Sequence, residues 1–161
     1  PKTVYSSIDQ MGRYAFANQS RIAQWNLAVL AQSMLPLFGE DEEAALAEGQ
    51  AAVDAFPNLF NAAYLSGMRA KLGLNEEREG DRELVQSLLD YMAANKADFT
   101  LTFRGLSNLS LDDPETHASI REVFLDPDDI DAWIEKWRAR LAQEGRVEAD
   151  RRAGSDRGCG R

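Results

Sequence analysis

The sequence of 161 residues contains a single cysteine, Cys159, and a single histidine, His117. One cysteine cannot form a disulfide within the chain, which favours a reducing compartment and therefore a cytoplasmic protein. One histidine cannot build a Cys/His metal cluster, and a catalytic triad would need a nucleophile and an orienting acid that the sequence does not place beside it. We therefore interpret His117 as an ordinary surface side chain.

Long apolar runs and positive charge are also scarce. No run approaches the about 18 apolar residues that a membrane-spanning helix needs, and no basic-then-apolar secretory leader is visible. The 18 Lys and Arg residues stand against 27 Asp and Glu residues, which gives a formal net charge of -9. Binding to nucleic acid needs clustered Lys and Arg. We therefore expect neither a membrane nor a nucleic acid as a partner.

Recognisable catalytic motifs are absent. The sequence has no Gly-rich phosphate loop followed by Lys, no His-Glu-x-x-His and no pair of cysteines. The acidic run Glu40-Asp41-Glu42-Glu43 is interpreted as a solvated helix start, because adjacent carboxylates on a helix do not converge on one metal ion. From the residues alone we predict no catalytic, cofactor-binding or metal-binding side chain.

Apolar residues recur at helical spacing along most of the chain. We predict an all-α protein, an irregular bundle of about six to seven helices. Residues 1–19 are expected to form a loop leading into the helical domain, 20–144 to form that domain, and 145–161 to form a disordered tail that is poor in apolar residues.

The first predicted helix runs from about Ser20 to Leu35. Its apolar residues cover most of the circumference, which predicts a central, buried helix. Pro36 and Gly39 are expected to close it, because proline cannot continue a helix and glycine is a common cap. Pro57 is expected to end the second helix in the same way.

Acidic residues mark the starts of several later helices. Asp81, Asp98 and Asp126 each precede a helical pattern and are predicted to be N-caps, the last followed by a proline at the first helical position. The segment Phe99–Leu106 also fits the alternation of a strand. We predict a helix there, because the neighbouring segments are all helical.

The loop before the first helix, Ser6 to Asn18, is polar for a segment that leads into an apolar helix. Asp9, Arg13 and Asn18 lose hydration there unless partners are in place. They either form hydrogen bonds that fix the loop on the helix, or face a site built partly by residues outside this chain. Val4, Tyr5 and Ile8 are candidates to anchor the loop to a core.

Several segments together resemble one known family. They are SSIDQMGRYAFANQ (6–19), WNLAVLAQSMLPL (25–37), FNAAYLSGMRAKLGL (60–74), ADFTLTFRGLS (97–107) and, more weakly, WIEKWRARL (133–141). In this order they resemble the selenoprotein O family, the pseudokinase-fold protein adenylyltransferases. The resemblance spans about residues 1 to 142 and covers the C-terminal part of a family member.

The resemblance implies a kinase-like fold and the transfer of AMP from ATP, with magnesium, to Ser, Thr or Tyr hydroxyls of protein substrates. It implies that the catalytic and metal-holding residues precede the position matching Pro1, so the fragment itself is expected to bind no cofactor and to be inactive alone. Asp9, Arg13 and Asn18 are then candidates for the mouth of the active site. The context of Cys159 departs from the family pattern, so no redox role is carried over to it.

Two functions remain open at this point. The chain is either the C-terminal helical portion of a bacterial, cytoplasmic adenylyltransferase or an independent helical module that binds a partner protein through an apolar face. Under either view, truncation would expose apolar surface through which the chain could form a homodimer.

Overall fold

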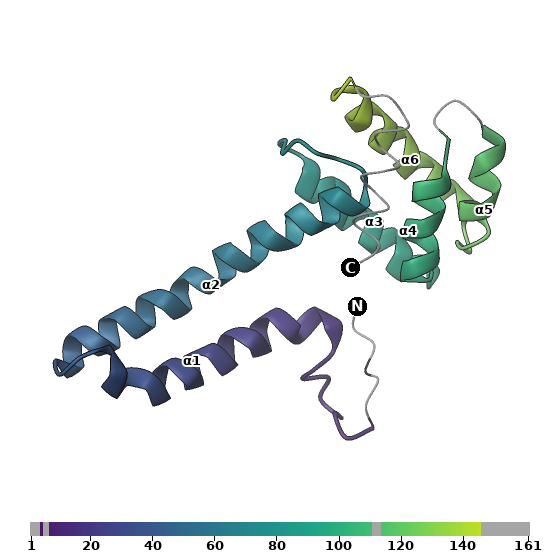
Figure 1. Cartoon of the computed structure of the whole chain (residues 1–161). Coiled ribbons are helices and arrows are strands. Elements are labelled where there is room, and N and C mark those ends of the chain that lie inside the picture. Colours follow the sequence, from purple (N-terminus) through teal and green to yellow (C-terminus); the bar gives the residue numbers. More distant parts are fainter. Residues whose placement is uncertain (1–3, 5–6, 111–113, 146–161) are drawn as a thin grey trace. The chain divides into compact units, whose positions relative to one another are not determined.

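The computed structural model describes residues 4, 7–110 and 114–145, which form helices and turns without any strand (Figure 1). The predicted all-α class and the irregular bundle are confirmed. Six α-helices and two 3-10 turns follow one another: η1 (Phe16–Asn18), α1 (Gln19–Phe38), α2 (Glu42–Lys71), α3 (Asp81–Asn95), α4 (Phe99–Asn108), η2 (Pro114–His117), α5 (Ala118–Arg121) and α6 (Pro127–Ala142).

The chain divides into two compact units, Pro1–Ala63 (unit 1) and Tyr64–Arg161 (unit 2), and α2 contributes residues to both. The predicted division into a loop, a helical domain and a disordered tail stays a prediction. Most of the tail, including Cys159, lies outside the described residues. No helix in the described part of the chain has the length and apolar character needed to cross a bilayer.

Two predicted helix breaks at proline are wrong. Pro36 lies inside α1 and Pro57 lies inside α2, which continues unbroken to Lys71. A proline inside a helix removes one hydrogen bond and costs about 3 kcal/mol. In α2 the alanine-rich sequence on both sides of Pro57 favours the helix strongly enough for it to continue. The predicted closure by glycine is confirmed, since Gly39 is the C-cap of α1.

The hydrophobic core lies in unit 2, and two stacked tryptophans are at its centre. The rings of Trp133 and Trp137 are fully buried, with their centroids 5.9 Å apart. Their indole N–H groups donate to the backbone carbonyls of Leu84 (2.9 Å) and Leu72 (3.0 Å). A buried indole N–H needs such a partner, so α6 is fixed in register against α3 and the end of α2. Around the pair pack Met68, Leu88, Met92, Phe103, Leu106, Leu109, Ile120, Ile130 and Ile134.

Local signals place two helix starts as predicted. The carboxylate of Asp98 accepts a hydrogen bond from the backbone N–H of Leu101 (2.8 Å) at the start of α4, which confirms the helix there. The carboxylate of Asp126 accepts from the N–H of Asp128 (3.1 Å), and Pro127 is the first residue of α6. Both caps satisfy backbone donors that a helix start leaves without partners.

Unit 1 has no comparable core. The expectation that the first helix is central and buried is wrong, because α1 contains no buried residue. The buried apolar side chains of unit 1 are small, namely Ala15 and Ala45. Near the turn between α1 and α2, a side chain added at Gly49 would lie within 3.4 Å of Leu35 and Phe38. An all-round apolar helix needs cover on several sides, and unit 1 supplies it only in part.

Candidate functional site

The loop before α1 is held in one conformation by the carboxylate of Asp9. Its two oxygens accept hydrogen bonds from the backbone N–H groups of Arg13 (2.7 Å) and Tyr14 (2.8 Å). Gly12, which lies between Asp9 and Arg13 in the sequence, has a positive φ of 65°, which a glycine adopts without strain. The N–H of Gly12 also donates to the backbone carbonyl of Asp9 (3.1 Å). Asp9 therefore organises the turn from within.

The other two predicted site residues close the same loop onto α1. The side-chain amide of Asn18 donates to the backbone carbonyl of Gly12 (2.7 Å). The guanidinium carbon of Arg13 lies 4.7 Å from the ring centre of Trp25 on α1 and 5.7 Å from that of Tyr14. Such distances are typical of cation–π contacts. Asp9, Arg13 and Asn18 thus lie in one short loop, and each makes contacts inside unit 1.

Two of the three residues predicted to anchor this loop to a core, Val4 and Ile8, are exposed, and the third, Tyr5, lies outside the described residues. Ile8, predicted to anchor the loop, is 92% exposed, and Met11 is 91% exposed. Tyr14 and Phe16 are also exposed.

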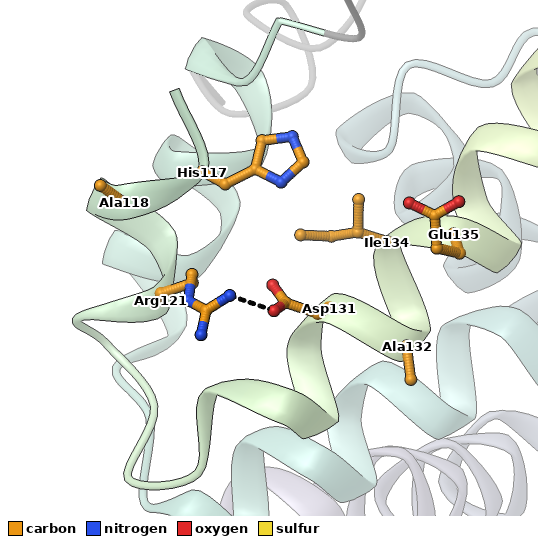
Figure 2. Close-up of a pocket in the computed structure, with 7 residues that line it drawn as sticks. All are labelled: His117, Ala118, Arg121, Asp131, Ala132, Ile134 and Glu135. Atoms are coloured by element: carbon orange, nitrogen blue, oxygen red, sulfur yellow. Dashed lines mark hydrogen bonds and ion pairs between the residues drawn. The ribbon is translucent and has the colours of Figure 1, made fainter. Parts of the chain in front are cut away.

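A second candidate is a hollow of about 510 Å³ in unit 2, between α5 and α6 (Figure 2). Figure 2 shows the imidazole of His117 and the carboxylate of Asp131 directed toward the same space, with Ile134 beside them. Arg121 forms an ion pair with Asp131 across one side of it. Glu135, on the other side, pairs with Arg138 (3.3 Å).

His117 is more constrained than an ordinary surface histidine. Its Nε2 lies 2.7 Å from a terminal guanidinium nitrogen of Arg138. Arginine can only donate hydrogen bonds, so Nε2 is the acceptor in this contact. Because both acids of the hollow are paired with arginines and His117 accepts from Arg138, we assign no reaction and no ligand to this hollow.

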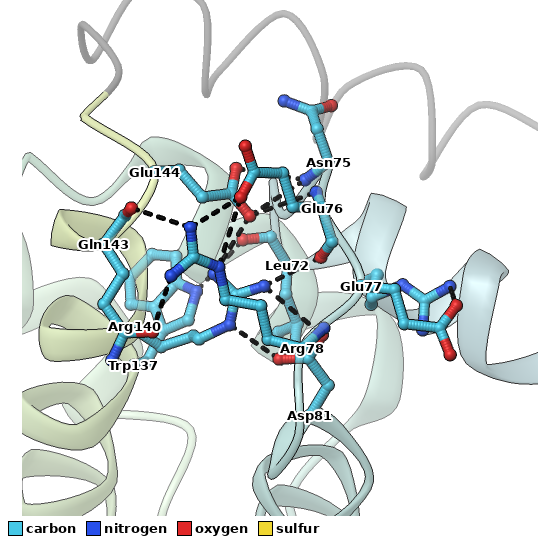
Figure 3. A network of polar contacts seen from close by, with 11 residues as sticks. Leu72, Asn75, Glu76, Glu77, Arg78, Asp81, Trp137, Arg140, Gln143 and Glu144 are labelled. Carbon is cyan, nitrogen blue, oxygen red and sulfur yellow. Dashed lines mark hydrogen bonds and ion pairs between the residues drawn. The ribbon is translucent and has the colours of Figure 1, made fainter.

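The most extensive polar network joins the end of α6 to the connector between α2 and α3 (Figure 3). Arg140 donates to the two carboxylate oxygens of Asp81 (2.7 and 3.3 Å), to a carboxylate oxygen of Glu144 (3.0 Å) and to the backbone carbonyl of Glu76 (2.8 Å). Glu144 also accepts from the backbone N–H groups of Asn75 and Glu76. The prediction that Asp81 is an N-cap is wrong, because Asp81 is the first residue of α3 and its carboxylate caps no helical N–H.

Arg140 stays charged despite its burial. Burial disfavours the guanidinium charge, but the hydrogen bonds and the attraction from Asp81 and Glu144 outweigh this and raise the pKa of Arg140 above its usual value. The network is a structural clamp. In the described residues no three His, Cys, Asp or Glu side chains are grouped as a metal site would require.

Comparison with known proteins identifies the family. The model of the protein adenylyltransferase SelO family matches residues 1–157 of this chain. The chain therefore belongs to the SelO family, as the sequence segments predicted.

Curated relatives agree with this assignment. The chain is 52% identical over 153 residues to a protein nucleotidyltransferase YdiU of a Bradyrhizobium species, covering 95% of this chain and 31% of the relative. It is 49% identical over 158 residues to the YdiU of Methylorubrum populi, covering 95% of this chain and 32% of that relative. It is 48% identical over 153 residues to the YdiU of Rhizobium etli, covering 95% of this chain and 30% of that relative. The chain thus spans about a third of the length of these relatives.

Proposed function

We propose that this chain is the C-terminal helical portion of a protein adenylyltransferase, and that it is inactive alone. The observation that carries the proposal is the family match over residues 1–157. The intact protein would transfer AMP from ATP, with magnesium, to Ser, Thr or Tyr hydroxyls of proteins. The relatives are about three times as long as the segment that this chain matches, which leaves room outside it for the catalytic groups.

The proposed reaction needs groups that we expect the rest of the intact protein to supply. A protein hydroxyl oxygen forms a bond to the α-phosphorus of ATP, the bond to the bridging oxygen breaks, and pyrophosphate leaves. The hydroxyl proton passes to a nearby base. In kinase-like folds this chemistry depends on a lysine, metal-holding Asp and Asn residues and a positioned acid. We assign none of these roles to a residue of this chain.

In the intact protein we place the loop of residues 7–18 at the mouth of the active site. The hydrogen bonds of Asp9 and Asn18 support a positioning role for these residues, because they fix the backbone of the loop on α1. Arg13, whose guanidinium contacts the ring of Trp25, would fix which side of the loop is directed toward the substrate.

The remaining expectations belong to the same proposal. The protein is proposed to be cytoplasmic and bacterial, as the bacterial relatives suggest. The net charge of -9 supports a protein rather than a nucleic acid as the substrate. A homodimer through exposed apolar surface is proposed only for the chain alone.

The test joins this chain to the part of the Bradyrhizobium relative that it does not span. The joined protein and the chain alone are incubated with magnesium and ATP labelled at the α-phosphate, and label retained on protein is counted. We expect retention with the joined protein only, and loss of it with a chelator. ATP labelled at the γ-phosphate separates AMP transfer from phosphate transfer. Label transferred by the chain alone contradicts the proposal.

A second function is favoured by one observation, the many exposed apolar side chains of unit 1. An independent interaction module would use them to bind a partner protein. It would be a stable monomer without the rest of the family protein, and the joined protein would transfer no label. The same experiment therefore separates the two functions.

A further inference from the structure

The exposed apolar side chains of this chain are distributed very unevenly. Of the sixteen large apolar side chains that are exposed among the described residues, thirteen lie in unit 1. Those on the loop and on α1 form what we call the unit 1 apolar surface: Ile8, Met11, Tyr14, Phe16, Trp25, Leu27, Val29, Leu30 and Leu37. Many exposed large apolar side chains gathered in one part of a soluble protein are typical of an interaction site.

The part of the unit 1 apolar surface on α1 is nearly free of charge. The helix α1 carries one charged residue, Arg21, among its 20 residues. The loop adds Asp9 and Arg13; it is held in place by Asp9 and Asn18, so its apolar side chains are presented without a large further cost in ordering. The partner that α1 fits is therefore largely apolar at the contact.

Unit 2 offers little apolar surface in return. Among the described residues of unit 2, most large apolar side chains are gathered in its own core, and those that are exposed are Phe99, Leu101 and Leu125. The relatives have about two thirds of their length outside the segment that this chain matches, which is room for a matching apolar surface.

We infer that the unit 1 apolar surface binds the portion of the family protein that this chain does not span, as an interface inside the intact protein. The inference rests on the proposed function, because it takes the intact protein to be the family enzyme. It goes beyond that function by naming the side chains of this chain that make the contact. In the intact protein α1 becomes the central helix that its apolar sequence predicts.

The oxidation of methionine gives a direct test. Met11 is 91% exposed, whereas Met68 is 4% exposed in the core of unit 2. The chain alone and the joined protein are treated with dilute hydrogen peroxide, and sulfoxide at each methionine is followed by mass spectrometry. We expect Met11 to be oxidised at least tenfold more slowly in the joined protein. Met68 should be oxidised slowly in both, which reports that unit 2 is folded.

Two matched leucine variants locate the contact. Leu30 on α1 and Leu101 on α4 are exposed to 52% and 56%. In the joined protein, Leu30→Glu should return Met11 oxidation to within about threefold of its rate in the chain alone, because a charge in an apolar interface is strongly unfavourable. Leu101→Glu should leave Met11 protected.

Other outcomes overturn the inference. Equal oxidation of Met11 in the chain alone and in the joined protein shows that the rest of the family protein does not cover it. Protection in the joined protein that appears only as its concentration is raised assigns the surface to a second copy, and protection already present in the monomeric chain alone assigns it to unit 2. The label-transfer assay on the same joined protein is separate: transfer without protection refutes only the interface, and protection without transfer refutes only the proposed enzyme.

Discussion

Arg140 and Asp81, 59 residues apart in the sequence, form an ion pair inside unit 2, with Nε of the arginine 2.7 Å from Oδ1 of the aspartate. Both side chains are buried, and Arg140 also binds Glu144 and the carbonyl of Glu76. Breaking a buried pair by removing one partner leaves an uncompensated charge, which costs more than the loss of an exposed pair. The stability of unit 2 should therefore fall strongly when either side chain of this pair is removed.

We predict that Asp81→Ala lowers the free energy of unfolding by about 3–5 kcal/mol. Urea denaturation followed by tryptophan fluorescence measures this. Glu77→Ala is the matched control, because Glu77 is 77% exposed and pairs with Arg69 at 2.9 Å. It should change the free energy by less than about 1 kcal/mol. Equal effects of the two variants would show that the Asp81–Arg140 pair is not the stabilising element.

Because α4 and α5 pack closely at Gly105, we predict that a single methyl group added there changes the stability of the protein. A Cβ added at Gly105 would lie 3.1 Å from Cβ of Ile120, whereas a Cβ at Gly67 on α2 would meet nothing within 4 Å. Gly105→Ala should destabilise the protein by about 1–3 kcal/mol through overpacking. Gly67→Ala should stabilise it by about 0.5–1 kcal/mol, because alanine is the better helix former.

Thermal unfolding of the two alanine variants checks these opposite signs. A stabilising Gly105→Ala would mean that α5 can shift away from α4.

The pH dependence of stability above neutrality is predicted from Tyr64, which packs against the core. Burial raises the pKa of the Tyr64 hydroxyl above its usual value of 10.0. The folded state then holds the proton more tightly than the unfolded chain, so the contribution is fully present below pH 10 and is lost as the pH rises through the raised pKa. Urea unfolding between pH 9 and about pH 11 should show this fall in stability.

Tyr64→Phe removes the titrating group, and its free energy of unfolding should fall less steeply over the same pH range. Tyr14→Phe is the matched control, because Tyr14 is 61% exposed. This control variant should follow the wild-type pH dependence. If Tyr64→Phe follows it as well, the pH dependence has another origin.

The loop before α1 gives a local prediction. Asp9→Ala removes the acceptor of two backbone hydrogen bonds, those from Arg13 and Tyr14. A hydrogen bond to a charged group contributes about 1.5–3 kcal/mol, so hydrogen exchange at these two amides should become roughly tenfold faster or more. Asp41→Ala removes a similar pair of bonds at the start of α2 and should leave Arg13 and Tyr14 unchanged. Unchanged exchange in Asp9→Ala would show that other contacts hold the loop.

The sequence predicted the elements whose signals are local. Asp98 and Asp126 each bind a backbone N–H two or three residues away, so a short pattern was enough to place the starts of α4 and α6. Asp81 also stands at the start of a helical pattern, but it is the first residue of α3 and its partner Arg140 comes much later in the chain. A local pattern cannot reveal such a partner, which is why Asp81 was interpreted as a cap.

The candidate loop shows the same limit. The sequence placed Asp9, Arg13 and Asn18 in one polar loop, and internal hydrogen bonding was one of the two interpretations given for them. It did not show that Ile8 and Met11 point outward, because the loop has no periodic pattern that would separate a buried face from an exposed one. Pro57 failed as a break for another reason: the helical preference of its neighbours outweighed the local cost of proline.

The three tryptophans are divided between the two units, so their intrinsic fluorescence reports on each unit separately. Trp133 and Trp137 are sealed in unit 2, whereas Trp25 is 53% exposed on α1. A soluble quencher such as acrylamide should therefore dim the red-shifted emission of Trp25 first and reach the blue-shifted pair only when unit 2 unfolds. Once another polypeptide covers α1, the accessible fraction of the fluorescence should disappear, so association can be followed without any dye.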